Sequence, residues 1–190
     1  MKKNNILKLI SPIAPTTNHY LNYRVMRKSG KNIVMPYPSK ETVAFKKSFI
    51  PYVKEEVGKQ NWEMDQTGLQ HYYVYWTVYF PRIDMDVSNQ DKVIIDSITE
   101  SEVVWKDDNV VCNRVDHIYY DSSSPRIELT IVPVDYIGVF ENEEHLNSFQ
   151  EKCKECKRYS NNCSILRKLI EGRIIEEYQD NECIKFKKKK

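Results

Sequence analysis

The chain has 190 residues, of which 41% are hydrophobic and 12% aromatic, and its formal net charge is +2. This length is typical of one full domain with a small appendage, and it suffices to bury a core without disulfide bonds. With Gly 5, Pro 8 and no apolar run approaching ~18 residues, the composition excludes collagen, low-complexity disorder and membrane-spanning helices.

The small net charge hides an uneven distribution. Residues 1–80 hold 12 basic and 5 acidic side chains, residues 81–144 hold 5 and 15, and residues 145–190 hold 12 and 7, so the segments carry +7, −10 and +5. Concentrated carboxylates repel one another unless a cation or a basic partner relieves them. The acidic centre therefore indicates a cation site, with chance clustering on solvated surfaces as the alternative.

The first half of the chain predicts a β-rich start, a helix and a strong strand. The expected strands and helix, in chain order, are 6–13, 23–27, 33–35, the helix 39–58, and 71–80. Ser29 and Gly30 form a hairpin turn signal, Ser39 is an N-cap, and Pro51 predicts a kink or break. For HYYVYWTVYF at 71–80 we favour a packed central strand over a surface that stacks bases.

The second half predicts a helix over 89–102 and a hairpin of two strands, 109–120 and 126–134. The expected fold is therefore one mixed α/β (α+β) domain over 1–140, with helices flanking a β-sheet. After Phe140 the chain becomes highly charged and holds four of the five cysteines, so we expect a small, helical, Cys-rich and basic module over 141–190.

The acidic segment PRIDMDVSNQDKVIIDSI places carboxylates where a strand ends and a helix begins. A Trp-Lys-Asp-Asp block follows before the next strand, and loops at strand ends bring separated side chains together. Carboxylate oxygens suit Mg²⁺, which stabilises the charge of a reacting phosphoryl group and activates water. A nearby lysine neutralises the developing phosphate charge. Ordinary helix-capping aspartates are the alternative.

The run from Asp86 to Lys92 (DVSNQDK), with Asp96 four residues on and the pair Asp107-Asp108 afterwards, resembles the RusA family of Holliday-junction resolvases. That family has the approximate pattern D-x-D-N-x-x-K-x-x-x-D, followed by an Asp-Asp pair that opens a strand. The segment Asn18-His19-Tyr20 is similar to the family's opening motif. The resemblance covers about residues 10 to 136 and implies a RusA-like mixed sheet flanked by helices.

Position by position, the resemblance implies that Asp86, Lys92 and Asp108 are catalytic. Ser88 stands where the family has a second aspartate, so Asp84 or Asp107 would supply the missing carboxylate. The implied Mg²⁺ ligands are then drawn from Asp84, Asp86, Asp107 and Asp108, with Mn²⁺ as a substitute ion. The candidate DNA-binding residues are Asn18, Arg24, Arg27, Lys28, Lys31 and Asn89.

The implied activity is that of a crossover junction endodeoxyribonuclease. As a homodimer it would bind four-way DNA junctions and cut two strands by symmetric nicks during recombination and repair. The alternative is a non-catalytic DNA-binding adaptor that keeps the fold and has lost cleavage through Ser88. The N-terminal segment lacks a signal-peptide core because Lys8 interrupts it, so we expect a cytoplasmic protein of a bacterium or phage-infected host, with no membrane partner.

A second group of candidate metal ligands is Cys153-x2-Cys156-x6-Cys163, with Cys183 further on. A C-x2-C turn followed by two more cysteines suits tetrahedral Zn²⁺, which would stabilise a small, highly charged module. Unrelated reduced thiols are the alternative. His145 is a substitute ligand, Cys112 is expected in the core, and Lys187 to Lys190 form either a flexible electrostatic arm or a solvated end.

Overall fold

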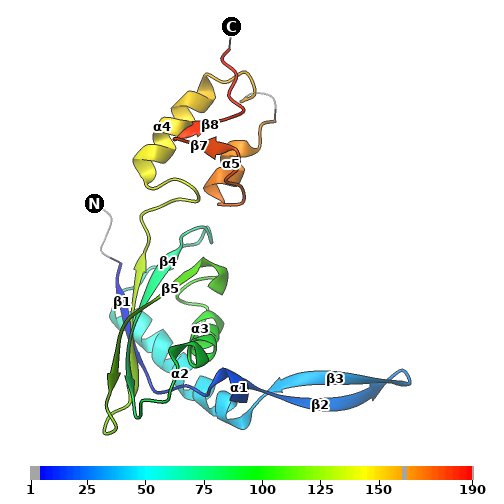
Figure 1. The fold of residues 1–190 in the computed structure, drawn as a ribbon, viewed down its shortest axis with the longest axis vertical. Helices are drawn as coiled ribbons and strands as arrows, with labels where there is room; N and C mark the ends of the chain where they lie inside the picture. Colours follow the sequence, from blue (N-terminus) through cyan, green and yellow to red (C-terminus); the bar gives the residue numbers. More distant parts are fainter. Residues whose placement is uncertain (1–4, 160–161, 190) are drawn as a thin grey trace. The chain divides into compact units, whose positions relative to one another are not determined.

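The computed structural model describes residues 5–159 and 162–189. The chain divides into two compact units, Met1–Pro133 and Val134–Lys190, which are described separately (Figure 1). The sequence-based boundary at 140 lies later than this division, because Phe140 packs in the core of the second unit. In the described part of the chain, no helix is long and apolar enough to cross a membrane.

The first unit is built on a four-stranded mixed sheet with the order β1-β6-β4-β5. Its strands are β1 (Leu7–Ser11), β4 (Tyr72–Phe80), β5 (Val111–Tyr120) and β6 (Arg126–Pro133). Strand β6 is antiparallel to both β1 and β4, whereas β4 and β5 are parallel. A parallel neighbour requires a crossover connection, and helix α3 (Asp91–Glu100) lies within that connection.

The expected hairpin of strands 109–120 and 126–134 is wrong. These segments are β5 and β6, but β4 lies between them and pairs with both. Strand β4 has a fully apolar face. In the centre of the sheet, both edges of β4 have a neighbouring strand, so its backbone polar groups are hydrogen-bonded on both sides. The short 121–125 turn spans that width, and the Asp121 backbone N–H donates to the Phe80 carbonyl at 2.8 Å.

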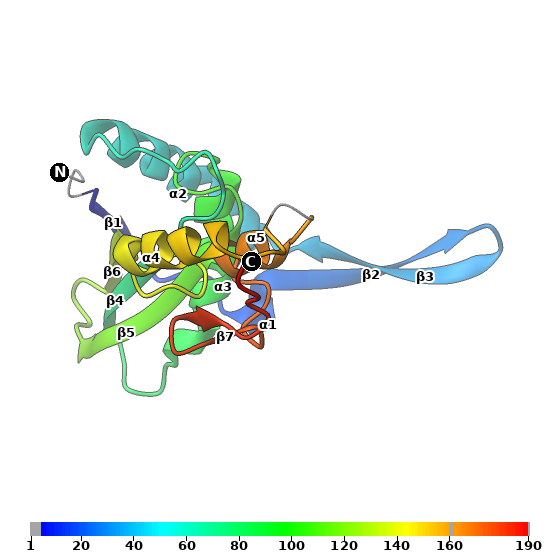
Figure 2. The ribbon, with the colours of Figure 1, turned by 90° about the horizontal axis from the view of Figure 1, so that it is seen from above.

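One face of the sheet packs against helix α2 (Lys40–Lys59) and α3 (Figure 2). The core joins alternate residues of β4 to one stripe of each helix: Tyr72, Val74, Trp76, Val78 and Phe80 with Phe45, Phe49, Val53, Val93, Ile94 and Ile98. This confirms the packed central strand. Ser39 caps α2 by accepting the Thr42 N–H at 3.1 Å, and the helix continues through Pro51.

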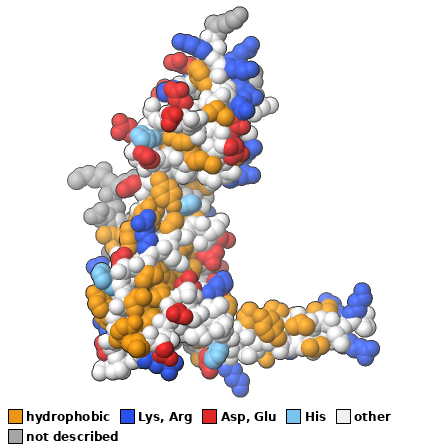
Figure 3. All heavy atoms as spheres, viewed as in Figure 1, with side chains coloured by type: hydrophobic (Ala, Val, Ile, Leu, Met, Phe, Trp, Pro, Cys, Tyr) orange, Lys and Arg blue, Asp and Glu red, His pale blue; other side chains and the backbone are white. Residues whose placement is uncertain are grey.

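The β2–β3 hairpin extends away from the sheet (Figure 1). It follows helix α1 (Thr17–Tyr20) and consists of β2 (Leu21–Lys28) and β3 (Lys31–Pro38), joined through Ser29 and Gly30 at φ 52° and 77°. Two positive φ values fit the tight turn that matches strand twist. All residues from 22 to 38 are exposed. Figure 3 shows hydrophobic side chains along the hairpin and basic side chains at its tip.

The second unit has a small core of four buried residues, Phe140, Leu146, Phe149 and Leu169. Its elements are α4 (Glu143–Lys154), α5 (Ile165–Ile170), β7 (Tyr178–Gln179) and β8 (Glu182–Cys183). The chain end returns to the turn after α4, because the Lys157 N–H donates to the Lys187 carbonyl at 2.7 Å and the Lys189 N–H donates to the Glu155 carbonyl at 2.9 Å. Lys187–Lys189 are therefore held in place, and the expectation of a free arm is wrong for them. Lys190 lies outside the described residues.

Candidate functional site

Helix α3 presents a lysine and an aspartate on the same face, one turn apart. Lys92 Nζ lies 2.7 Å from Asp96 Oδ1, as the i,i+4 spacing allows. The Lys92 side chain is 54% exposed and that of Asp96 is 15% exposed, so the ammonium is open to a ligand while its carboxylate partner is largely enclosed. The pair lines a surface pocket between α3 and the start of β5. The lining residues are Asp91, Lys92, Ile95 and Asp96 of α3 with Asp108, Val111 and Asn113.

Asp96 is held from its other side by a hydrogen-bonded chain of side chains. The Tyr20 hydroxyl donates to Asp96 Oδ2 at 2.6 Å, and Lys46 Nζ donates to the Tyr20 oxygen at 3.3 Å. Lys46 also pairs with Glu100 at 2.5 Å and lies 5.3 Å from the centre of the Tyr20 ring. The chain joins α1, α2 and α3, and it fixes the carboxylate that orients Lys92.

The charges in the pocket keep Lys92 protonated. Its hydrogen bond to Asp96 raises the pKa of Lys92 against a smaller effect of burial, and the charges of Asp96 and Asp108 raise it further. Burial and the hydrogen bond to Asp96 also raise the pKa of Tyr20, so this hydroxyl stays a donor near neutral pH. The pocket therefore holds a cationic lysine among carboxylates, so a bound cation would be needed to make its net charge favourable for a phosphate.

Asp107 and Asp108, just before β5, have different roles. The Asp107 side chain accepts the Asn109 N–H at 2.9 Å and caps the 3-10 helix η2 (Asp108–Val110). Asp108 lines the pocket. The structure thus brings Asp108 together with Lys92, and it gives Asp107 a local capping bond.

The two aspartates of the loop after β4 lie outside the lining of this pocket. Asp84 pairs with Arg82 at 2.8 Å, and both side chains are more than half exposed. Asp86 precedes the 3-10 helix η1 (Val87–Asn89), and its Oδ2 accepts from Asn89 Nδ2 at 3.4 Å. Asp86 and Ser88 are both exposed.

The donor set of the pocket fits a hard cation bound by few protein ligands. Within residues 5–159 and 162–189, no group of three or more His, Cys, Asp or Glu side chains is arranged to hold a metal ion. Mg²⁺ commonly uses only one or two carboxylates and keeps several waters. The carboxylates of Asp91 and Asp108 offer oxygen atoms of this kind. Both oxygens of Asp96 accept hydrogen bonds from Lys92 and Tyr20, and Asn113 Oδ1 accepts one from Trp76 Nε1 at 3.1 Å.

The sequence did not identify several of the residues that form the site. The Lys92–Asp96 spacing was visible and predicts the pair. Tyr20 belongs to the segment that is similar to the family's opening motif, but nothing local indicates its contact with Asp96, and Lys46 and Asn113 carry no local signal. Gln90, just before α3, is fully buried, and its amide has no hydrogen-bond partner among the described residues. An unpaired buried amide costs about 1–3 kcal/mol of stability.

A lysine grouped with aspartates on an α+β domain with an exposed basic hairpin is typical of enzymes that act on nucleic-acid phosphodiesters. The family model described as Endodeoxyribonuclease RusA matches residues 12–132, and the chain belongs to this family of DNA endonucleases. A comparison with curated proteins found no match. The family match confirms the resemblance and the expected mixed fold, and its range contains Asp86, Lys92 and Asp108.

Proposed function

We propose that this protein is a Mg²⁺-dependent endodeoxyribonuclease that resolves four-way DNA junctions by paired symmetric nicks. The observation that carries the proposal is the pocket in which Lys92 lies with Asp96 and Asp108, within the residues that the family model matches. Its place of action would be the cytoplasm of a bacterium or a phage-infected host.

In this proposal Lys92 binds the scissile phosphate. Its ammonium is half-exposed and oriented by Asp96, so it offers fixed positive charge where negative charge develops. Asp108, which lines the pocket, and Asp86, in the loop after β4 outside its lining, would hold Mg²⁺. Asp84 and Asp107 are further carboxylates nearby in sequence. When bound, the ion lowers the pKa of an attacking water and stabilises the phosphate charge.

The basic residues of the hairpin would contact the DNA backbone. Arg27, Lys28 and Lys31 flank the Ser29-Gly30 turn, and Arg24 lies 5.8 Å over the Tyr37 ring further down the hairpin. Such contacts position DNA without reading its sequence, and they weaken as salt increases. Asn18 on α1 and Asn89 on η1 are proposed as further DNA contacts near the pocket; Thr17 Oγ1 donates to the Asn89 carbonyl at 3.4 Å.

The apolar part of the same hairpin would form the contact between two protomers. Its exposed hydrophobic side chains are Tyr23, Val25, Met26, Ile33, Val34, Met35 and Tyr37. A two-stranded hairpin with apolar side chains on both faces is marginally stable in water by itself, and such a surface marks a protein interface. A second copy of the chain is the proposed partner, because two symmetric cuts need two equivalent sites.

The test is cleavage of a synthetic four-way junction in Mg²⁺. We expect the wild-type protein to make paired nicks and to prefer the junction over linear duplex, and Asp108→Asn and Lys92→Ala to lose about 10²–10³-fold in cleavage rate while still binding. Lys54→Ala, at an exposed position of α2, is the matched control and should keep full activity. Junction binding without nicking in Mg²⁺ or Mn²⁺ would identify a non-catalytic adaptor and overturn the proposal.

A further inference from the structure

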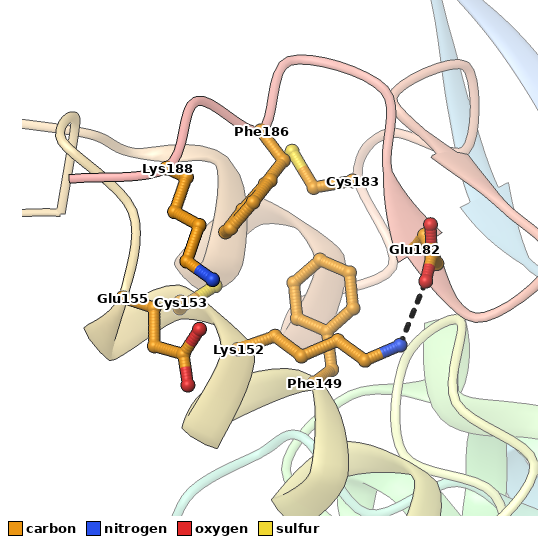
Figure 4. A pocket seen from close by; sticks show the side chains of 8 residues that line it. All are labelled: Phe149, Lys152, Cys153, Glu155, Glu182, Cys183, Phe186 and Lys188. Carbon is orange, nitrogen blue, oxygen red and sulfur yellow. Dashed lines mark hydrogen bonds and ion pairs between the residues drawn. The ribbon is translucent and has the colours of Figure 1, made fainter. Parts of the chain in front are cut away.

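Four of the five cysteines converge in the second unit. Cys153 lies in the last turn of α4, Cys156 in the following turn, Cys163 just before α5, and Cys183 at the end of β8. All four line one pocket, together with Arg158, Tyr159, Ile165, Leu166, Arg167, Lys185 and Phe186. Figure 4 shows an adjoining pocket into which Cys153 of α4 and Cys183 of β8 reach from different elements. Segments 30 residues apart therefore bring their thiols to one place.

Backbone N–H groups surround two of these sulfurs. Cys156 Sγ accepts from the Lys187 N–H at 3.5 Å, and the N–H groups of Arg158 and Tyr159 also point to it. Cys183 Sγ accepts from the Lys185 N–H. Donors of this kind favour the thiolate, which is the form that binds metal.

The pocket shared by the four cysteines is the place where a cation would bind. Metal coordination deprotonates a thiol outright, so a bound divalent ion would hold these side chains as thiolates.

The second unit has few other sources of stability. Its core cluster has four buried residues in α4, α5 and the segment before them, while Cys163 lies in the loop before α5 and Cys183 in the two-residue strand β8. Small units with so little core depend on disulfides or a structural metal. The chain end is also tied to the Cys156 turn, through the Lys157–Lys187 and Glu155–Lys189 backbone hydrogen bonds.

We propose that Cys153, Cys156, Cys163 and Cys183 form a structural Zn²⁺ site that joins α4, α5, β8 and the chain end. Binding releases the four thiol protons and forms four Zn–S bonds of about 2.3 Å in a tetrahedron. The described side chains are not in coordinating positions, so rotation of the thiols toward the ion accompanies binding. The resulting charge of −2 is offset by Arg158, Arg167 and Lys185, which line the same pocket.

The fourth ligand is a cysteine and not His145. His145 lies in the first turn of α4, eight residues before Cys153, which places it about 12 Å away along the helix axis. Its Nδ1 lies 3.5 Å from Glu141. Cys112 lies on β5 in the first unit and serves as the control thiol.

The experiment uses the full-length chain purified under reducing conditions, with zinc measured by elemental analysis. We expect one zinc per chain in the wild type and in Cys112→Ser, and at least a tenfold weaker affinity in Cys183→Ser and Cys156→Ser. Because a cysteine variant can fail for lack of folding, Co²⁺ is also titrated into the chelator-treated wild type. A tetrahedral spectrum with intense sulfur-to-cobalt bands is expected, and Zn²⁺ should abolish it.

Absence of stoichiometric zinc together with absence of the cobalt bands would overturn the proposal, as would disulfides between these cysteines under reducing conditions. Equal loss of metal in Cys112→Ser would also overturn it. None of these measurements depends on DNA cleavage, so failure of the zinc site and failure of the proposed nuclease are distinguishable.

Discussion

Replacing Gly138 by alanine should destabilise the second unit more than any other glycine substitution in it. Gly138 has φ +57°, and an added Cβ would lie 2.7 Å from the Ile170 carbonyl carbon and closer still to the carbonyl oxygens of Leu169 and Ile170. The obstacle is backbone at the end of α5, so no side-chain rotation relieves it. The Leu169 carbonyl also accepts the N–H groups of Val139 and Gly172, both at 3.1 Å.

The expected cost follows from these contacts. A non-glycine residue in the left-handed region loses about 1–2 kcal/mol. Displacing the Leu169 carbonyl weakens two hydrogen bonds of about 1 kcal/mol each. The combined loss of about 3–4 kcal/mol should reduce the protection of amide protons in the second unit against hydrogen exchange by two to three powers of ten, since ~1.4 kcal/mol is a factor of ten.

Gly172→Ala is the matched control for this prediction. Its φ is also positive, at +65°, but its nearest neighbour is the Gly138 Cα at 3.6 Å, which is an ordinary contact. It should therefore lose only the conformational cost of about 1–2 kcal/mol. If Gly138→Ala loses no more protection than Gly172→Ala, the close approach of Gly138 to α5 is not what holds this unit together.

Three further predictions concern α3 and the segments next to it. Tyr20→Phe removes the donor to Asp96 and should lower the free energy of unfolding by about 1.5–3 kcal/mol in urea denaturation; an unchanged midpoint would show that Lys92 alone satisfies Asp96. Gln90→Met replaces an unpaired buried amide and should raise stability by about 1–3 kcal/mol, whereas a loss would reveal a bound water as its partner. Ser88→Asp adds a carboxylate beside Asp86 and should lower the Mg²⁺ concentration for half-maximal nicking about tenfold; no shift would remove position 88 from the metal site.

Local patterns in the sequence predicted the elements with strong periodicity. The alternation of residues 71–80 indicated β4 and its buried face, and the Ser39 cap and the Ser29-Gly30 turn were readable because each acts within a few residues. The pairing of β5 with β6 was predicted wrongly, since adjacency in the chain is a weak guide to adjacency in a sheet. The reason for the observed order lies in β4, whose fully apolar face accounts for its central position between β5 and β6.

The site was predictable only as far as its motif extends along the chain. The resemblance to the family's motif identified Lys92 and Asp108, and the structure brings both to one pocket. The capping bond of Asp107 depends on the turn that follows it. The contact of Tyr20 with Asp96 joins residues 76 positions apart, and no local pattern encodes such a contact.

The three tryptophans, Trp62, Trp76 and Trp105, all lie in the buried core of the first unit, and the described part of the second unit holds none. Tryptophan emission therefore follows the first unit alone, while thiolate-to-metal absorption would follow the second. A single sample titrated with denaturant can be observed through both signals at once, so whether the two units unfold together or in succession is measurable without any added label.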